Sequence, residues 1–329
     1  MVGLESTKQV AKVTGADSIN RTDTRFGIHA TDLGILWAGG DGRLRVLFGD
    51  TYGAGWCGDG AGPEHADWRS NVLAYAGSGS LEEGLRLEEA VTREDGRAAQ
   101  VLPSVPGELT VIPNSGIALG DRDFVHYMSI RQWGEPGTWQ TNHAGIAVSA
   151  DGARTWIRPD TAVWPNTAAF DQKFQIGAFA YAAGYVYLFG TSNGRFSDAF
   201  LARVPEAEIL DTGAYEYRTA NGWSGQDTAA VGVIPGPIGE LSVGYNDFLG
   251  AWVALHLDEH RAAIVLRTAP ELDGPWSAGT VLVSGADYPA LYGGYLHPGS
   301  LGGPELHYLI SQWRPYNVFH LCSRLTRSA

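Results

Sequence analysis

A pattern of short apolar runs, joined in pairs by glycine-rich turns, recurs five times along the chain and constrains its fold more than any other feature. In each repeat two runs form a hairpin by their turn chemistry, and further short runs follow. Repeats of about four strands, spaced by roughly 50 to 80 residues, are typical of a β-propeller. The five repeats begin near Ala30, Gly116, Gln175, Glu240 and Tyr292.

We therefore predict an all-β protein that forms a single five-bladed β-propeller over residues 1–329. An additional run at residues 7–13 precedes the first repeat, and we expect it to close the ring by pairing with the last blade. The abundance of glycine (44), tyrosine (14) and tryptophan (11) suits short aromatic strands joined by tight turns. A β-sandwich is the alternative architecture, but it explains the fivefold recurrence less well.

Two short segments support the propeller as turns between outer strands. Residues 149–156 (SADGARTW) resemble the Asp-box turn of sialidase-type propellers, with Ala153 in place of the usual glycine. Residues 272–276 (LDGPW) resemble a turn between outer strands of arabinanase-type propellers. We interpret both segments as structural, and we place the last strands of the second and fourth blades near Trp156 and Trp276.

The charge of the chain argues against several classes of partner. The formal net charge of −13 argues against nucleic acid and anionic membranes, because both would repel an acidic surface. No segment has the length and apolarity of a membrane span.

The first five residues contain no signal region, which fits a cytoplasmic protein or a secreted one whose signal peptide has been removed. Cys57 and Cys322 define no disulfide framework, so we expect two unpaired thiols, and we expect a monomer.

The first hairpin is predicted to bring two carboxylates together. In a propeller the first strand of each blade lines the central channel and starts at the ligand-binding face, where the second strand ends. If the turn centres near Asp41, the numbers of paired residues sum to about 82, which places Asp32 opposite Asp50. Two carboxylates that close cannot both ionise freely, so one residue type can supply a general acid and a general base or nucleophile. The alternative is structural, with Asp50 capping a turn and Asp32 bonded to backbone.

Further candidates surround this pair. A glycine-rich loop of about twenty residues leaves Asp50, and loops of that length inside a compact domain are usually functional or disordered. Glu240 opens the fourth blade in an otherwise apolar strand, where burying a lone carboxylate is costly, and its functional and structural interpretations are equally open. We expect no metal and no cofactor, because no cluster has ligand spacing and no phosphate-binding motif is present. The candidate substrate-binding residues are Trp56, His65, Trp68, Arg69, Asn71, Glu240 and His297.

Residues 48–52 (FGDTY) and 68–73 (WRSNVL) together resemble a bacterial family long labelled a domain of unknown function. Its members are known as endo-D-arabinanases, glycoside hydrolase family 183. Residues 239–246 (GELSVGYN), 249–253 (LGAWV) and 308–313 (YLISQW) are also similar to that family. The resemblance covers most of the chain, and its first two motifs are fairly specific only in combination.

The resemblance implies a five-bladed propeller that cleaves internal α-D-arabinofuranosidic bonds in the arabinan of mycobacterial arabinogalactan and lipoarabinomannan. It implies that Asp32 and Asp50 are the essential acidic pair, and that the protein is secreted. It leaves open which aspartate is the acid, whether the reaction retains or inverts the anomeric configuration, and what Glu240 does. Its partner would be an arabinan polysaccharide or oligosaccharide.

Two other functions remain alternatives at this stage. The first is a propeller that binds carbohydrate without cleaving it, in which replacing either aspartate by asparagine would leave affinity intact. The second is a sialidase-like glycosidase, which needs an arginine cluster and a tyrosine–glutamate nucleophile pair. Arg69 and Arg131 are available for such a cluster, but no complete triad assembles at the blade starts.

Overall fold

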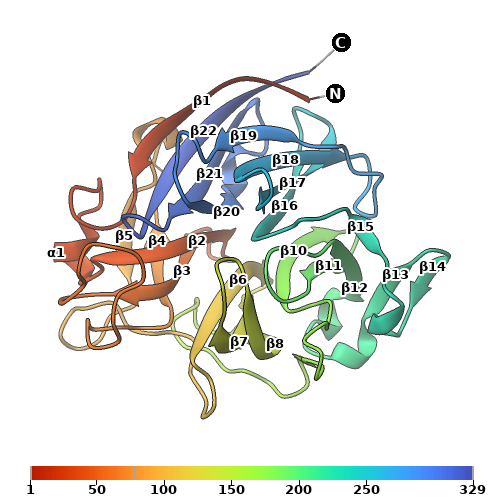
Figure 1. Cartoon of the computed structure of the whole chain (residues 1–329), viewed down its shortest axis with the longest axis horizontal. Coiled ribbons are helices and arrows are strands. Elements are labelled where there is room, and N and C mark those ends of the chain that lie inside the picture. Colours follow the sequence, from red (N-terminus) through yellow and green to blue (C-terminus); the bar gives the residue numbers. More distant parts are fainter. Residues whose placement is uncertain (1, 78, 328–329) are drawn as a thin grey trace.

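The computed structural model describes residues 2–77 and 79–327, and its strands form five antiparallel sheets arranged around a ring (Figure 1). The first blade contains β2 (Ala30–Ala38), β3 (Leu44–Tyr52), β4 (Val72–Ala76) and β5 (Leu87–Ala90). The second contains β6 (Thr110–Leu119), β7 (Arg122–Trp133), β8 (Trp139–Ser149) and β9 (Val163–Pro165). The third contains β10 (Ile176–Ala182), β11 (Tyr185–Thr191), β12 (Ala199–Pro205), β13 (Glu216–Thr219) and β14 (Gly222–Ser224), with β15 (Gly232–Ile234) paired to β12.

The fourth and fifth blades complete the ring. The fourth contains β16 (Leu241–Asn246), β17 (Ala251–Asp258), β18 (Ala263–Ala269) and β19 (Thr280–Ser284). The fifth contains β20 (Leu291–Leu296), β21 (Glu305–Gln312), β22 (Asn317–Arg327) and β1 (Val2–Lys12). The helices are short: α1 (Thr22–Phe26) and the 3₁₀ turns η1 (Leu81–Glu83), η2 (Glu206–Glu208), η3 (Thr212–Ala214), η4 (Asp227–Ala229) and η5 (Pro298–Ser300).

The first strands of the five sheets contact one another in a closed cycle, from β2 through β6, β10, β16 and β20 back to β2. The ring is closed by the N-terminal strand, because β1 pairs with β22 from Val2 opposite Arg327 to Lys12 opposite Phe319. Figure 1 shows β1 and β22 side by side at this seam. The predicted five-bladed propeller and the predicted role of the N-terminal strand are both confirmed.

The last strands of two blades differ from the prediction. They are β9 and β19, whereas Trp156 and Trp276 lie in the turns that precede them. Trp156 is buried, packs edge-on against Trp37 of β2 at 6.4 Å, and donates from Nε1 to the carbonyl of Ala153 at 3.0 Å. The indole of Trp156 thus secures the turn and the contact between the first two blades, and the last strand of the second blade begins only at Val163.

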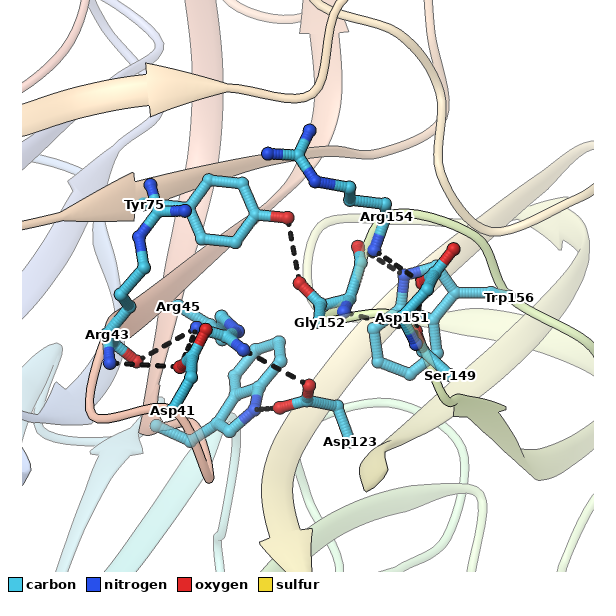
Figure 2. A network of polar contacts seen from close by, with 12 residues as sticks. Asp41, Arg43, Arg45, Tyr75, Asp123, Ser149, Asp151, Gly152, Arg154 and Trp156 are labelled. Atoms are coloured by element: carbon cyan, nitrogen blue, oxygen red, sulfur yellow. Dashed lines mark hydrogen bonds and ion pairs between the residues drawn. The ribbon is translucent and has the colours of Figure 1, made fainter. Parts of the chain in front are cut away.

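Figure 2 shows the Asp-box turn as a hydrogen-bonded unit. Asp151 accepts hydrogen bonds from the backbone N–H groups of Arg154 at 3.0 Å and Thr155 at 2.9 Å. The hydroxyl of Ser149 accepts from the N–H of Ala153 at 3.1 Å. Ala153 has a φ of 69°, the left-handed conformation in which glycine is usual, and an L-residue there costs roughly 1–2 kcal/mol. The segment is therefore a structural turn, as predicted.

A buried ion cluster beside this turn joins the first blade to the second (Figure 2). Arg45 is 1% exposed and pairs with Asp41 at 2.8 Å and with Asp123 at 3.4 Å. Asp123 also accepts a hydrogen bond from Trp37 Nε1 at 2.7 Å. Since a buried charge is tolerated only when it is paired, this cluster fixes the contact between two neighbouring sheets.

Two further expectations concern the chain as a whole. Cys57 is exposed and Cys322 is buried, and both are free thiols, as predicted. Within residues 2–77 and 79–327, no helix reaches the length and apolarity that a membrane crossing requires.

Candidate active site

A cavity of about 770 Å³ opens at one end of the central channel. The starts of β2, β6 and β20 border it, whereas the ends of the same strands border a smaller cavity at the opposite end. The larger cavity therefore lies at the face predicted to bind ligands. Its ionisable side chains are Asp32, Asp50, Glu64, Arg195, Glu240 and Glu259, and its aromatic side chains are Tyr52, Trp68, Trp133, Trp139, Tyr292, Tyr295, Trp313 and Tyr316.

The predicted hairpin register is correct along most of the first blade but not at the aspartates. Ala30 pairs with Tyr52 and Leu36 with Val46, so both pairs sum to 82. Between them the ladder is interrupted on either side of Leu33, which has a φ of 67°, and Gly34 follows with a φ of 89°. The prediction that Asp32 lies directly opposite Asp50 is therefore wrong in detail, because a bulge re-aims Asp32.

The carboxylate of Asp32 turns toward the fifth blade. Its Oδ2 accepts hydrogen bonds from the hydroxyls of Tyr292, on β20, and Tyr316, between β21 and β22, each at 3.0 Å. Its Oδ1 is buried without a protein hydrogen-bond partner in the described chain and lies against Gly49. A Cβ added to Gly49 would lie 2.4 Å from that oxygen, so glycine at this position makes room for the carboxylate.

Asp50 turns the other way, toward the second blade. It is 7% exposed, and its Oδ1 accepts hydrogen bonds from Trp68 Nε1 at 2.9 Å and from the hydroxyl of Thr110, on β6, at 2.7 Å. Trp68 lies at the end of the long loop that leaves Asp50, so the loop returns to the residue from which it starts. Two adjacent strands thus present two carboxylates to one cavity, each held by a different neighbouring blade.

Both aspartates have raised pKa values. Burial and the nearby charge of Asp50 raise the pKa of Asp32 to about 7, against the lowering effect of the two tyrosine hydroxyls. Burial raises the pKa of Asp50 to about 6, and the hydrogen bonds from Thr110 and Trp68 oppose that rise. Near neutral pH Asp32 is therefore protonated in a large fraction of molecules while Asp50 is mostly ionised, which is an arrangement suited to acid–base catalysis.

Glu240 belongs to a second charged group on the cavity wall. Its Oε1 accepts hydrogen bonds from Arg195 Nη2 at 2.7 Å and Nε at 3.0 Å, and Glu259 approaches the same guanidinium at 3.6 Å. The guanidinium also lies 5.1 Å from the ring centre of Tyr292, which donates to Asp32. Two carboxylates thus surround the guanidinium of Arg195 on the cavity wall.

The structure brings four of the nine predicted site residues to this cavity, namely Asp32, Asp50, Trp68 and Glu240. Trp56, His65, Arg69, Asn71 and His297 do not line it. Trp56 donates from Nε1 to the carbonyl of Gly60 at 3.0 Å and packs behind the wall formed by Tyr52 and Tyr316, while His65 lies exposed on the same loop. Substrate contact by these five residues stays a prediction, which the lining of this cavity does not support.

The reason is that three of the five serve the fold. Arg69 is buried and donates to the carbonyls of Ala98 at 3.3 Å and Gly27 at 3.1 Å. Asn71 Oδ1 accepts from two backbone N–H groups, at 3.1 and 2.8 Å, which anchors the end of the loop. His297 follows the end of β20, so it lies a whole strand length from Tyr292 and at the opposite face, where its Nδ1 accepts from Gly299 N–H at 3.1 Å.

Several residues of the site were missed from sequence. Tyr292 occupies a blade start, so the rule that pointed to Glu240 could have found it. Thr110 stands at the start of β6, several residues before the predicted start of that strand. Tyr316, Trp139 and Arg195 lie in or beside loops and carry no local signal that distinguishes them from packing residues.

Among residues 2–77 and 79–327, no group of three or more His, Cys, Asp or Glu side chains is arranged to hold a metal ion. The chemistry that the described residues themselves can perform is proton transfer, because a protonated carboxyl and an ionised carboxylate face one cavity.

Two known proteins are similar in sequence to most of this chain. A protein from Aspergillus versicolor named notoamide biosynthesis cluster protein J' is 32% identical over 309 residues, covering 88% of this chain and 82% of that protein. Notoamide biosynthesis cluster protein J of an Aspergillus strain is 30% identical over 311 residues, covering 88% and 81%. Both relatives therefore share nearly the whole propeller.

Solved structures share the fold at low sequence identity. A Bacteroides ovatus protein matches with a TM-score of 0.63 at 13% identity, covering 91% of this chain and 86% of its own. Zg3597, a family 117 glycoside hydrolase from Zobellia galactanivorans, matches at 0.56 and 13%, covering 97% and 90%. A GH43_1 enzyme from Xanthomonas citri, complexed with xylotriose, matches at 0.53 and 12%, covering 91% and 88%. At such identities the similarity establishes the propeller fold alone.

The family comparison matches residues 17–321 to a domain of unknown function, DUF4185. The resemblance inferred from the FGDTY and WRSNVL motifs is thereby confirmed at the level of a family labelled a domain of unknown function, without an arabinanase specificity. Because the match covers nearly the whole chain, the protein belongs to the DUF4185 family.

Proposed function

We propose that the protein is a glycoside hydrolase in which Asp32 is the general acid and Asp50 is the general base or nucleophile. One observation carries the proposal: two carboxyls from adjacent strands reach one aromatic-walled cavity, with pKa values raised to about 7 and about 6. The group with the higher pKa keeps its proton to a higher pH, so Asp32 is suited to donate and Asp50 to accept.

In the proposed reaction Asp32 transfers its proton to the glycosidic oxygen as the bond to the anomeric carbon breaks. Asp50 either takes a proton from the attacking water or attacks the anomeric carbon itself, forming an ester that water then hydrolyses. The hydroxyls of Tyr292 and Tyr316 stabilise the Asp32 carboxylate that remains after proton transfer, since both donate to its Oδ2.

The proposed substrate is an arabinan cleaved at internal α-D-arabinofuranosidic linkages. The FGDTY and WRSNVL motifs support this choice, and their Asp50 and Trp68 are hydrogen-bonded to each other at 2.9 Å in the cavity. The aromatic lining supports a carbohydrate, because ring faces stack on the apolar faces of sugars. The structural neighbours described by name as glycoside hydrolases support the reaction class.

The alternatives fit the cavity less well. A sialidase needs arginines free to bind a carboxylate, but Arg69 is buried outside the cavity, Arg131 is exposed, and Arg195 is paired with Glu240. A purely carbohydrate-binding propeller gives no reason for two proton-transfer groups with raised pKa values. A second candidate is a step in a biosynthetic pathway, since two relatives are named as notoamide biosynthesis cluster proteins.

The test is incubation with mycobacterial arabinogalactan, followed by chromatography of the released arabino-oligosaccharides. We expect product from the wild type and at least a 10³-fold loss in Asp32→Asn and Asp50→Asn, the scale seen when a member of a catalytic unit is removed. Asp160→Asn, which alters an exposed aspartate, is the matched control. Binding without release of product would favour the binding propeller, and undiminished product from Asp50→Asn would refute the role of Asp50. Proton NMR of the first-formed anomer then distinguishes retention from inversion.

A further inference from the structure

Three buried polar atoms in the wall of the cavity have no hydrogen-bond partner among the described residues. They are Asp32 Oδ1, Trp139 Nε1 and Glu240 Oε2. The first belongs to the acid–base pair, but the other two have no part in the proton transfers. Leaving a buried donor or acceptor unsatisfied is costly, so such atoms in a native protein call for an explanation.

Trp139 and Glu240 both line the cavity, and Arg195 approaches both of them. The guanidinium of Arg195 binds Oε1 of Glu240 through two N–H groups, which leaves Oε2 without a partner. The same guanidinium lies 5.8 Å from the ring centre of Trp139. Trp133 packs edge-on against Trp139 with ring centres 5.9 Å apart.

The two side chains come from different blades. Trp139 is 7% exposed and Glu240 is 8% exposed, so each is largely buried in the wall of the cavity that it lines. Trp139 comes from the second blade, Arg195 from the loop after β11 in the third, and Glu240 from the start of the fourth. A donor and an acceptor are thus assembled by three blades, beside the ring of Tyr292, which Arg195 also approaches at 5.1 Å.

We propose that Trp139 Nε1 and Glu240 Oε2 form a subsite that recognises hydroxyl groups of the substrate. The indole N–H donates to a hydroxyl oxygen, and a hydroxyl O–H donates to the carboxylate. A hydroxyl is suited to this pair because it both accepts and donates, whereas an ammonium group only donates and a carbonyl only accepts. The inference rests on the proposed function and adds to it the feature of the sugar that the site reads.

The binding test uses Trp139→Phe, which removes the N–H and keeps an aromatic ring at the position. The probe is a tetrasaccharide of α-linked D-arabinofuranose, measured by calorimetry in an Asp50→Asn background so that it is not cleaved. We expect the Kd to rise about 10- to 100-fold, because a site built to bond a hydroxyl loses that bond. The ligand-free protein should unfold at an unchanged or higher urea concentration, since the substitution removes an unsatisfied buried donor.

Trp156→Phe is the matched control, because the indole N–H of Trp156 is buried but bonded to the carbonyl of Ala153 at 3.0 Å. The same substitution there should lower stability and leave the Kd unchanged. Trp139→Phe is therefore expected to weaken binding without lowering stability, and Trp156→Phe is expected to lower stability without weakening binding.

A panel of tetrasaccharides, each lacking one hydroxyl of one residue, identifies the group that is read. At least one analogue should bind the Asp50→Asn protein at least 10-fold more weakly than the parent, and this penalty should disappear in the Trp139→Phe variant. An unchanged Kd in Trp139→Phe, or the same penalty in both proteins, would overturn the subsite. These outcomes differ from failure of the proposed function: binding without cleavage by the wild type defeats the hydrolase and leaves the subsite standing.

Discussion

Replacing Asp32 by asparagine should inactivate the protein and yet stabilise its fold at alkaline pH. The pKa of Asp32 is raised from 3.8 to about 7, mainly by burial, so the folded protein prefers the protonated carboxyl. An acid with a raised pKa destabilises the fold where it is ionised, so wild-type stability should rise as the pH falls through about 7 toward 3.8. Asparagine is neutral throughout and removes this dependence.

The magnitude follows from the shift. A rise from 3.8 to about 7 is 3.2 pKa units, and at about 1.4 kcal/mol per unit it corresponds to at most about 4 kcal/mol above pH 8. Because the cavity is open to water, we expect roughly half of that, about 2 kcal/mol. The stability gain of Asp32→Asn over the wild type should vanish near pH 4, where Asp32 is protonated in the wild type and the side chain is neutral in both proteins.

The assay is urea unfolding of wild type and Asp32→Asn at pH 8 and pH 4.5, followed by tryptophan fluorescence and analysed by linear extrapolation. Asp160→Asn, at an exposed position, is the control variant. If Asp32→Asn is less stable than the wild type at pH 8, or gains equally at both pH values, then Asp32 is not a destabilising buried carboxyl. The assignment of Asp32 as the acid would then lose its physical basis.

Three other perturbations test separate parts of the structure. Thr110→Val removes a 2.7 Å hydrogen bond to Asp50, so the pKa of Asp50 should rise above about 6. The acid limb of the pH profile of kcat/KM should then move to higher pH by about one unit. An acid limb that does not move would exclude Asp50 as the base. Gly49→Ala places a Cβ 2.4 Å from Asp32 Oδ1, so kcat should fall at least 10-fold while the fold persists, and full activity would show that this contact does not position the acid. Asp123→Ala leaves the buried guanidinium of Arg45 short of one partner, so it should lower the free energy of unfolding in urea by about 3–5 kcal/mol. The activity per folded molecule should stay unchanged. A loss of stability below about 1 kcal/mol would contradict the role assigned to this interblade ion cluster.

The requirements of the site and those of the fold are opposed at Asp32. Its Oδ1 is buried against Gly49 without a partner, and the nearby charge of Asp50 raises its pKa further. Strained or unsatisfied groups of this kind persist where the surrounding structure holds them and function requires them. Here the propeller supplies the rigidity through neighbouring blades, since the second holds Asp50 and the fifth holds Asp32.

The sequence by itself determined the five blades, the closure of the ring by the N-terminal strand, and the register of the first hairpin. These features depend on local information: the spacing of apolar runs, the residues of the turns, and the pairing of strands joined by a short connection. Asp32 and Asp50 were found together because one such hairpin carries both. The bulge at Leu33 escaped prediction, since its N–H is held by Ser311, which lies 278 residues away in sequence.

Only the tertiary structure decided what surrounds the two aspartates. Tyr292 and Tyr316 donate to Asp32 across 260 and 284 residues, and Thr110 donates to Asp50 across 60. His297 and Tyr292 lie at the two ends of one strand, so a difference of five residues separates the cavity from the opposite face. Closing the ring brings distant blade starts and loops to one channel mouth. No local sequence pattern indicates which of these residues will come into contact there. The candidate acid–base pair was therefore readable from the chain, whereas the tyrosines, Thr110 and the Trp139–Arg195–Glu240 group required the folded propeller.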